Sequence, residues 1–233
     1  VEVLGRAIEY GELTNGAFDV TVAPVLDLYR ERAMRGAGLP TVEEVDAARA
    51  LVDYRALAVD GRTIAFRRPG MALTLDGIAK GYVVDRAVAT LMAAGADRVL
   101  VGASGDIATS AASREDGWDI AIQDPRNIDG SLGVLRLRGE SVATSGDYMH
   151  AFTQDRAYHH IIDPRTGRSP GHIAAVTTVA PSAMDADALS TAAFVLGPEE
   201  GLALLERLDG VEGLIVTKDG RQLQTSGFRR LHA

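Results

Sequence analysis

The spacing of hydrophobic residues changes from strand-like to helical within residues 71–92. Residues 71–75 form a short apolar run, which predicts a strand that leads into the turn Asp76-Gly77. From there apolar residues recur every three or four positions, which predicts one buried helix face made of Ile78, Tyr82, Val83, Ala87, Val88, Leu91 and Met92. A glycine turn before a helix N-terminus leaves free backbone N–H groups, which attract phosphate.

The remaining patterns predict both helices and strands. Helices are expected at residues 1–10, 25–32, 41–51, 184–194 and 198–208, and the third begins with a capping box of Thr41 and Glu44. Strands are expected at 98–102, 118–122, 133–137, 141–143, 159–162 and 175–179, with hairpins turning at 60–61 and 218–220. Residues 144–148 and 163–167 are predicted to be turns. Because strands and helices do not alternate strictly, the pattern favours an α+β fold.

Composition narrows the class of protein. The 233 residues, 46% of them hydrophobic, suit one domain with a sizeable core. A net charge of −8 argues against nucleic acid as a partner, and no apolar run approaches the roughly 18 residues of a membrane span. The absence of cysteine excludes thiolate catalysis and zinc–thiolate sites. The first residue is a valine inside a helical pattern, so we expect an N-terminal piece to be missing.

Two polar residues on one predicted helix suggest a metal site. Asp187 and Thr191 lie one helical turn apart, and their oxygens are hard ligands suited to Mg²⁺. The alternative is that Asp185 or Asp187 only caps the helix. Lys80 lies in the first turn of another predicted helix, where a cation is unfavourable unless an anion lies beside it. Its alternative is an ordinary solvated lysine.

The pair His159-His160 is a second candidate for chemistry. In a strand the two side chains point to opposite faces, so only one of them can face a site. A histidine beside a reacting hydroxyl or phosphate can act as general base or acid. The alternative is a histidine that bonds a backbone carbonyl. Histidine spacing does not match a zinc site, and no G-x-G-x-x-G, Walker or G-x-S-x-G motif is present.

Six motifs, taken together and in this order, resemble the ApbE family, the FAD:protein FMN transferases. They are T-N-G-A-F-D (14–19), L-D-G-I-A-K-G-Y-V-V-D (75–85), G-D-I (105–107), S-V-A-T-S-G-D-Y (141–148), H-H-I-I-D-P-R-T-G (159–167) and D-A-L-S-T (187–191). The resemblance implies one ApbE-like α+β domain over residues 1–233, with mixed β-sheets packed with helices and an FAD site between two lobes. It implies that the family's first strand and any signal segment precede this sequence.

The same resemblance implies a reaction and its residues. Such an enzyme would bind FAD with Mg²⁺, split the pyrophosphate, and join FMN to a threonine of an acceptor protein through a phosphoester, releasing AMP. Asp187 and Thr191 would bind the metal together with a backbone carbonyl near Gly77. His160 would transfer a proton, and Asp187 would also count as catalytic. The FAD contacts implied are Ala17, Phe18, Asp19, Thr74, Asp76, Lys80 and Ile162.

One position departs from the family pattern. The family usually has D-L-G-G-I-A-K-G, and here Thr74 replaces the first acid while Asp76 replaces the first glycine. A shift of two residues would keep the acid on the same strand face. Asp76 could then serve as an FAD contact or as a metal ligand, and both alternatives stay open.

The resemblance leaves two other functions to weigh. One is an FAD pyrophosphatase that gives the phosphoryl group to water, and the other is a non-catalytic flavin-binding or carrier protein. A carrier should contain an acceptor motif D-x-x-[S/T]-G-A-[T/S], but the nearest stretch, residues 106–112, ends in Ala112 where the acceptor hydroxyl should be. The implied acceptor is a membrane-associated redox subunit with that motif, and the implied location is the periplasm or cell envelope.

Overall fold

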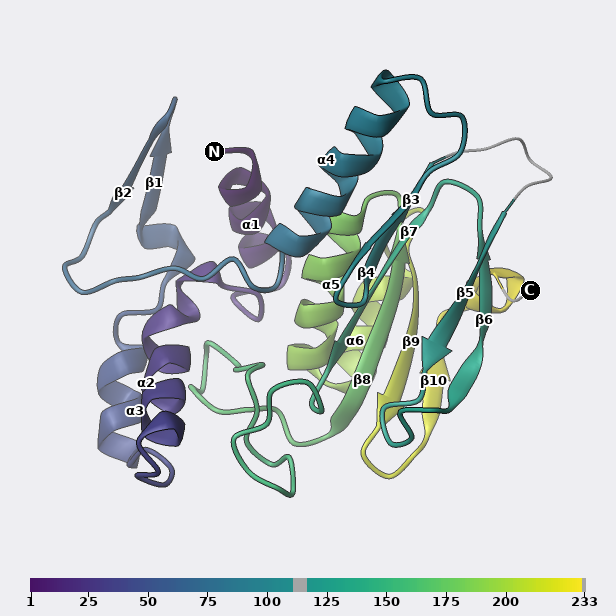
Figure 1. Ribbon diagram of the computed structural model, residues 1–233. Coiled ribbons are helices and arrows are strands. Elements are labelled where there is room, and N and C mark those ends of the chain that lie inside the picture. Colours follow the sequence, from purple (N-terminus) through teal and green to yellow (C-terminus); the bar gives the residue numbers. More distant parts are fainter. Residues whose placement is uncertain (111–116, 232–233) are drawn as a thin grey trace. The chain divides into compact units, whose positions relative to one another are not determined.

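The computed structural model describes residues 1–110 and 117–231 (Figure 1). Ala111 and Ala112, at the end of the acceptor-like stretch, lie outside the described residues. Contacts divide the chain into two compact units, the first made of Val1–Gly77 and Asp147–Gly171 and the second of Ile78–Gly146 and His172–Ala233. We describe each unit by itself.

The first unit is mainly helical. It contains α1 (Glu2–Leu13), η1 (Val20–Val22), α2 (Ala23–Met34), α3 (Val42–Arg49), η2 (Tyr54–Ala56) and the antiparallel hairpin β1 (Leu57–Asp60) and β2 (Thr63–Phe66). The capping box that opens α3 is present, because the Thr41 hydroxyl accepts from the backbone N–H of Glu44 and the Glu44 carboxylate accepts from that of Thr41. A hydrophobic cluster joins α2 and α3 to the later loop, through Val25, Leu26, Tyr29, Val45 and Ile162.

Helix α1 runs past Gly11, where the sequence pattern predicted its end. A Cβ at Gly11 would lie 2.8 Å from the ring of Tyr54, so this glycine allows the ring to pack directly on the helix backbone. Packing against a neighbour, rather than helix termination, therefore explains the residue.

The second unit is a six-stranded antiparallel sheet covered by helices. Its strand order is β10-β9-β8-β7-β4-β3, and the strands in chain order are β3 (Leu100–Ala103), β4 (Asp106–Thr109), β7 (Ser141–Gly146), β8 (Ile173–Ala180), β9 (Glu212–Thr217) and β10 (Gln222–Gln224). A separate ribbon pairs β5 (Trp118–Gln123) with β6 (Ser131–Leu137), and η3 (Phe228–Leu231) follows β10.

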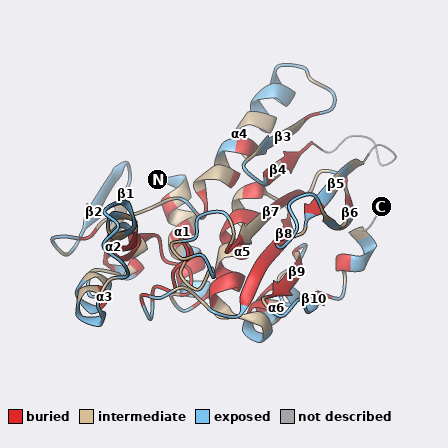
Figure 2. Ribbon diagram, turned by 60° about the horizontal axis from the view of Figure 1, so that its bottom comes forward, coloured by how far each residue is buried: buried red, intermediate tan, exposed pale blue. Residues whose placement is uncertain are grey.

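Three helices pack side by side against this sheet (Figure 1). Helix α4 (Ala79–Ala93) lies against β3 and β4, α5 (Ala183–Leu196) against β7 and β8, and α6 (Pro198–Glu206) against β9. Strand β8 is buried along its whole length (Figure 2). The α+β prediction is therefore confirmed.

Two predicted strands are wrong. Residues 71–75 are irregular, because no neighbouring strand offers them a ladder; the backbone N–H of Thr74 instead donates to Val20 O at 2.8 Å. Residues 159–162 are also irregular, although an isolated bridge joins His159 to Ala151. The Ser169 hydroxyl accepts from His159 N and donates to His159 O, so a side chain takes the place of a partner strand.

Two further predictions need correction. Residues 144–146 belong to strand β7 rather than to a turn, because Thr144 and Ser145 pair with Thr177 and Val176 of β8. On α4 the predicted apolar face is buried only near its start. Val83, Leu91 and Met92 are exposed by 59%, 46% and 36%. The helix packs mainly through Val84, which lies against Ala108 and Ala183, and Val88 of the predicted face packs against the same cluster.

Candidate functional site

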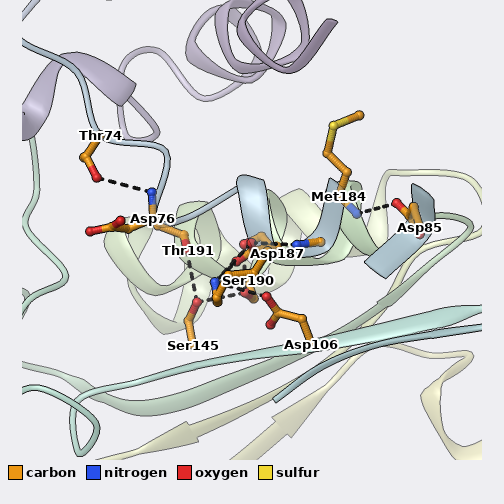
Figure 3. Close-up of polar contacts among 11 residues, drawn as sticks. Thr74, Asp76, Asp85, Asp106, Ser145, Met184, Asp187, Ser190 and Thr191 are labelled. Atoms are coloured by element: carbon orange, nitrogen blue, oxygen red, sulfur yellow. Dashed lines mark hydrogen bonds and ion pairs between the residues drawn. The ribbon is translucent and has the colours of Figure 1, made fainter. Parts of the chain in front are cut away.

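The start of α4 packs very closely on the start of α5. A Cβ at Gly81 would lie 2.1 Å from the carbonyl oxygen of Ala183, so only glycine permits this approach. One turn later the Asp85 carboxylate accepts from the backbone N–H groups of Ala183 and Met184 at 2.8 and 2.9 Å. Figure 3 shows the bond from Met184. These N–H groups lack partners within their own helix. Gly81 and Asp85 thus fix the first two turns of α4 against the N-terminus of α5.

This packing creates an acid–lysine cluster, which we define as Lys80, Asp106 and Asp187. The ammonium nitrogen of Lys80 lies 3.0 and 3.1 Å from the two carboxylate oxygens of Asp187 and 3.0 Å from Asp106 Oδ2. Asp187 Oδ2 also accepts from the backbone N–H of Gly81 at 3.3 Å. The anion that the position of Lys80 required is therefore supplied, within this unit, by two protein carboxylates.

The cluster contains one cation for two buried acids. The carboxylate side chains are 2% and 4% exposed, whereas that of Lys80 is 39% exposed. Burial, reinforced by the charge of Asp187, raises the pKa of Asp106 to about 7. Burial also raises the pKa of Asp187, against the opposing effect of Lys80. Burial opposes the charge of Lys80, but the two carboxylates together raise its pKa. The cluster can therefore accept further positive charge.

Hydroxyl groups lie next to the cluster on α5 and β7. Ser145 Oγ lies 2.8 Å from Ser190 Oγ and 3.1 Å from Thr191 Oγ1 (Figure 3). The Ser190 hydroxyl in turn donates to the backbone oxygen of Asp187 at 2.9 Å. A threonine inside a helix is explained when its hydroxyl has a partner, and Ser145 supplies one here. Asp187 and Thr191 lie on the same helix, one turn apart, as the sequence predicted.

The donor set can be compared with the needs of a metal ion. No group of three or more His, Cys, Asp or Glu side chains arranged to hold a metal occurs among the described residues. Mg²⁺ does not require one, since it is usually bound by one or two carboxylates together with waters and substrate phosphates. Asp187 and Thr191 both offer oxygen, and Asp106, whose Oδ2 lies 3.0 Å from the ammonium nitrogen of Lys80, adds a second buried carboxylate beside them. These residues fit a hard divalent cation.

In the first unit, Asp19 is held by backbone and hydroxyl donors. Its carboxylate accepts from Thr21 N at 2.8 Å, Thr21 Oγ1 at 2.6 Å and Tyr54 N at 2.9 Å. Burial raises its pKa, and these hydrogen bonds oppose that rise. The carboxylate caps η1 and ties it to η2, which is a structural role for a residue predicted as an FAD contact.

The three apolar residues predicted at the FAD site lie inside the first unit. Ala17, Phe18 and Ile162 are 1%, 4% and 5% exposed. The ring of Phe18 packs edge-on against Tyr10 with centroids 6.1 Å apart, and Ile162 belongs to the cluster of α2 and α3. Their side chains are therefore part of the core of the first unit.

Asp76 forms an ion pair with Arg30, whose Nη2 lies 2.7 Å from Asp76 Oδ2. Its backbone N–H donates to Thr74 Oγ1 at 3.2 Å. Because residues 71–75 are not a strand, the expected shared strand face of positions 74 and 76 does not exist. Gly77, the predicted backbone ligand, follows directly as the last residue of this segment.

His160 is surrounded by other basic groups. Its ring lies edge-on to those of His150 and His159, with centroids 5.3 and 6.5 Å apart. Burial lowers its pKa to about 4, and the charges of His150, His159 and Arg30 contribute. The imidazole is therefore neutral at pH 7, which leaves a lone pair available to accept a proton.

The sequence prediction missed three residues that shape the second unit's site: Asp85, Asp106 and Ser145. Each lies in one of the six motifs, and Ser145 falls within residues 144–148, which the sequence predicted to be a turn. Asp85 carried a usable signal, since it follows Gly81 by four residues and so shares its helix face.

Comparisons with known proteins identify the family of the chain. The family model described as "ApbE family" matches residues 1–215. The chain is 36% identical to the FAD:protein FMN transferase of Vibrio cholerae over 97% of its length and 70% of the relative's. It is 34% identical to the protein of the same name from Treponema pallidum, over 97% of its length and 67% of the relative's.

Solved structures give the same result. The ApbE protein of Thermotoga maritima superposes with a TM-score of 0.89 at 31% identity, covering all of this chain and 77% of the other. The flavinyl transferase ApbE of Pseudomonas stutzeri, in its apo form, gives 0.83 at 34% identity, covering 99% and 74%. Sequence and structure together place this chain in the ApbE family.

Proposed function

We propose that this protein is an FAD:protein FMN transferase. The observation that carries the proposal is the acid–lysine cluster beside Thr191, an oxygen-rich and anionic site on the packed start of α4 and α5. Relatives named FAD:protein FMN transferase match nearly the whole chain, which supports the same assignment. ApbE-family membership supports FAD as the substrate and a protein as the acceptor.

The reaction is a phosphoryl transfer. The acceptor threonine oxygen attacks the phosphorus nearer the flavin, a new P–O ester bond forms, and the bond to the AMP phosphate breaks with its electron pair leaving on AMP. The hydroxyl proton must go to a base, and neutral His160 is the candidate in the first unit. Catalysis of such a step consists mainly of positioning and charge stabilisation.

We further propose that Asp187 and Thr191 hold Mg²⁺, with the backbone carbonyl of Gly77 as an additional ligand. When bound, the ion would neutralise charge on the diphosphate oxygens. Asp187 and Thr191 stand at the required one-turn spacing, and Ser145 orients the hydroxyl of Thr191. The FAD contacts proposed from family resemblance are Lys80 in this unit and residues 17–19, Thr74, Asp76 and Ile162 in the first unit.

The test mixes the protein with FAD, MgCl₂ and a domain that carries the motif D-x-x-[S/T]-G-A-[T/S]. Mass spectrometry should find one FMN added to the acceptor threonine, with an equal amount of AMP released. FMN and AMP without an adduct would instead identify an FAD pyrophosphatase. FAD binding without any cleavage would identify a flavin-binding protein, and either outcome would overturn the proposal.

Asp187→Ala tests the metal assignment. The variant should lose Mg²⁺-dependent AMP release by at least about 100-fold, since a ligand and its charge are removed together. Asp209→Ala is the matched control, because Asp209 is an exposed aspartate of the same unit. Circular dichroism should show both variants folded. Full AMP release by folded Asp187→Ala would refute the assignment.

The class of acceptor protein and the cellular location are also proposals. We propose a membrane-associated redox subunit as acceptor and the periplasm or cell envelope as location, on family resemblance alone. In this protein no described helix has both the length and the apolar character needed to cross a bilayer. Cell fractionation with an antibody to the chain, followed by flavin fluorescence of the envelope proteins, tests both proposals.

A further inference from the structure

Lys80 is shared between two acids that belong to different elements. Its ammonium nitrogen is as close to Asp106, at the start of β4, as to Asp187 on α5, at 3.0 Å in each case. Asp187 is the metal ligand of the proposed function, whereas the function proposed above gives Asp106 no role. Lys80 therefore pairs both with Asp187, which a bound metal would need as a ligand, and with Asp106, which the metal would not need.

The side chains of Asp106 and Asp187 are buried and held in place, whereas the side chain of Lys80 is more exposed and can move. Asp187 is anchored because it sits on a buried helix and accepts from the backbone N–H of Gly81. Asp106 is 1% exposed and pairs, in β4, with Ala103 of β3 across a turn with positive φ at Ser104 and Gly105. The side chain of Lys80 is 39% exposed and ends a flexible four-carbon chain. Any rearrangement in the cluster should therefore be a movement of Lys80.

A divalent cation on Asp187 would repel the ammonium group that now lies on both oxygens of that carboxylate. Lys80 would then keep only its contact with Asp106 within the cluster, and that contact already exists. Asp106 would then keep the ammonium group as the partner of its own buried carboxylate, which would be costly to leave unpaired. Without Asp106, Lys80 would have Asp187 as its single acid in the cluster and would compete with the metal.

Resting on the proposed function, we propose that Asp106 is a positioning residue that takes Lys80 from Asp187 when a divalent cation binds. Asp106 acts through the lysine and does not itself bind the ion. The exchange involves no bond formation or redox change; one ion pair is traded for another. Lys80, freed from Asp187, remains on the same side of the site, where the proposed function places its contact with the nucleotide.

A double-mutant cycle tests this inference. Mn²⁺ is titrated into the protein with and without FAD, and free Mn²⁺ is followed by electron paramagnetic resonance, so that the readout does not depend on turnover. In the wild-type background Asp106→Asn should weaken Mn²⁺ binding by about 10- to 100-fold, as is usual for residues that support a metal ligand. In the Lys80→Met background the same change should weaken binding by less than about threefold. Asp106→Glu should restore most of the affinity.

Several outcomes would overturn the proposal. An equal loss in both backgrounds would make Asp106 a direct metal ligand, and no loss in either would remove it from the site. Failure of the wild type to bind Mn²⁺ would refute the proposal together with the metal assignment. Thermal unfolding without metal controls for misfolding, and a variant that is unfolded is replaced in the cycle by Asp106→Ser.

The outcome is separable from that of the proposed function. FMN transfer to the acceptor domain by the wild-type protein decides the function, whatever the cycle gives. If transfer is observed and the cycle is additive, only the role of Asp106 fails. If the cycle shows coupling but no adduct forms, only the transferase assignment fails.

Discussion

The carboxylates of Asp19, Asp85, Asp106 and Asp187 fall into two groups, which their hydrogen bonds distinguish. In Asp19 and Asp85 both carboxylate oxygens accept hydrogen bonds from backbone N–H groups, and these bonds stabilise the fold. Asp106 and Asp187 instead share one lysine. Incomplete neutralisation, rather than burial alone, therefore marks the pair that is suited to chemistry.

Asp19→Asn should destabilise the protein. An asparagine has one acceptor oxygen in place of two, so either Thr21 or Tyr54 would lose its acceptor and face an amide NH₂ group instead. We expect a loss of about 2–3 kcal/mol in the free energy of unfolding, measured by urea denaturation. The control Asp60→Asn, at an exposed hairpin turn, should change stability by less than about 0.5 kcal/mol. A similar small change in Asp19→Asn would contradict the structural role.

His160 should make stability depend on pH. Its pKa is lowered from 6.5 to about 4 in the folded state, so the unfolded chain takes up a proton first as the pH falls. Stability should therefore decrease between pH 6.5 and pH 4 and be unaffected by this group above pH 6.5. The full shift corresponds to about 3 kcal/mol, and partial exposure of the ring reduces that figure.

The measurement compares urea denaturation at pH 7.0 and pH 5.0. His160→Gln should lose part of the destabilisation seen on going to pH 5.0, while His172→Gln, at an exposed histidine, should behave as the wild type. An NMR titration of the His160 ring with a midpoint near 6.5 would refute the shift directly.

At the scale of elements, the contact of α4 with α5 decides whether the site forms. Gly81→Ala would force a Cβ to within 2.1 Å of a backbone carbonyl, and backbone cannot move aside as a side chain could. We expect a loss of about 2–4 kcal/mol in unfolding free energy, since the two helices must separate. The metal affinity should fall as well, because the backbone N–H of Gly81 donates to Asp187 Oδ2, an oxygen of the proposed metal ligand.

Gly5→Ala is the matched control for that variant. Gly5 lies inside α1 with no atom within 4 Å of the position its Cβ would take. Alanine is the better helix former, so this change should stabilise the protein by up to about 1 kcal/mol. If both variants behaved alike in thermal unfolding, the close approach at Gly81 would be disproved.

The elements also show what periodicity can and cannot predict. The capping box of α3 and the hairpin at Asp60-Gly61 were predictable because their signals are local. The strand expected at residues 71–75 was not, since an apolar run does not reveal whether a partner strand exists. The face of α4 was misjudged because the sequence does not state how much of a helix its neighbours cover.

At the scale of the whole molecule, the sequence predicted some residues of the site and missed others. Motif order was enough to select Lys80, Asp187 and Thr191, and the structure brings these three to one place in the second unit. The pairing of Lys80 with Asp187 joins positions 107 residues apart, and no local pattern encodes such a contact. Asp106 was missed for that reason, since its importance lies wholly in which side chain it meets.

The exposed end of α4 has a consequence for hydrogen exchange. Its buried residues, Gly81 and Val84, both lie in its first half, whereas every residue from Ala89 to Ala94 is exposed. Local opening is cheapest where few apolar contacts must be broken. In deuterium exchange followed by NMR, the amides of Val84 and Val88 should therefore outlast those of Leu91 and Met92 by at least about tenfold. Uniform protection along the helix would contradict this expectation. A gradient would mean that α4 is rigid at its N-terminal part, which carries Lys80, and that its exposed C-terminal part opens readily.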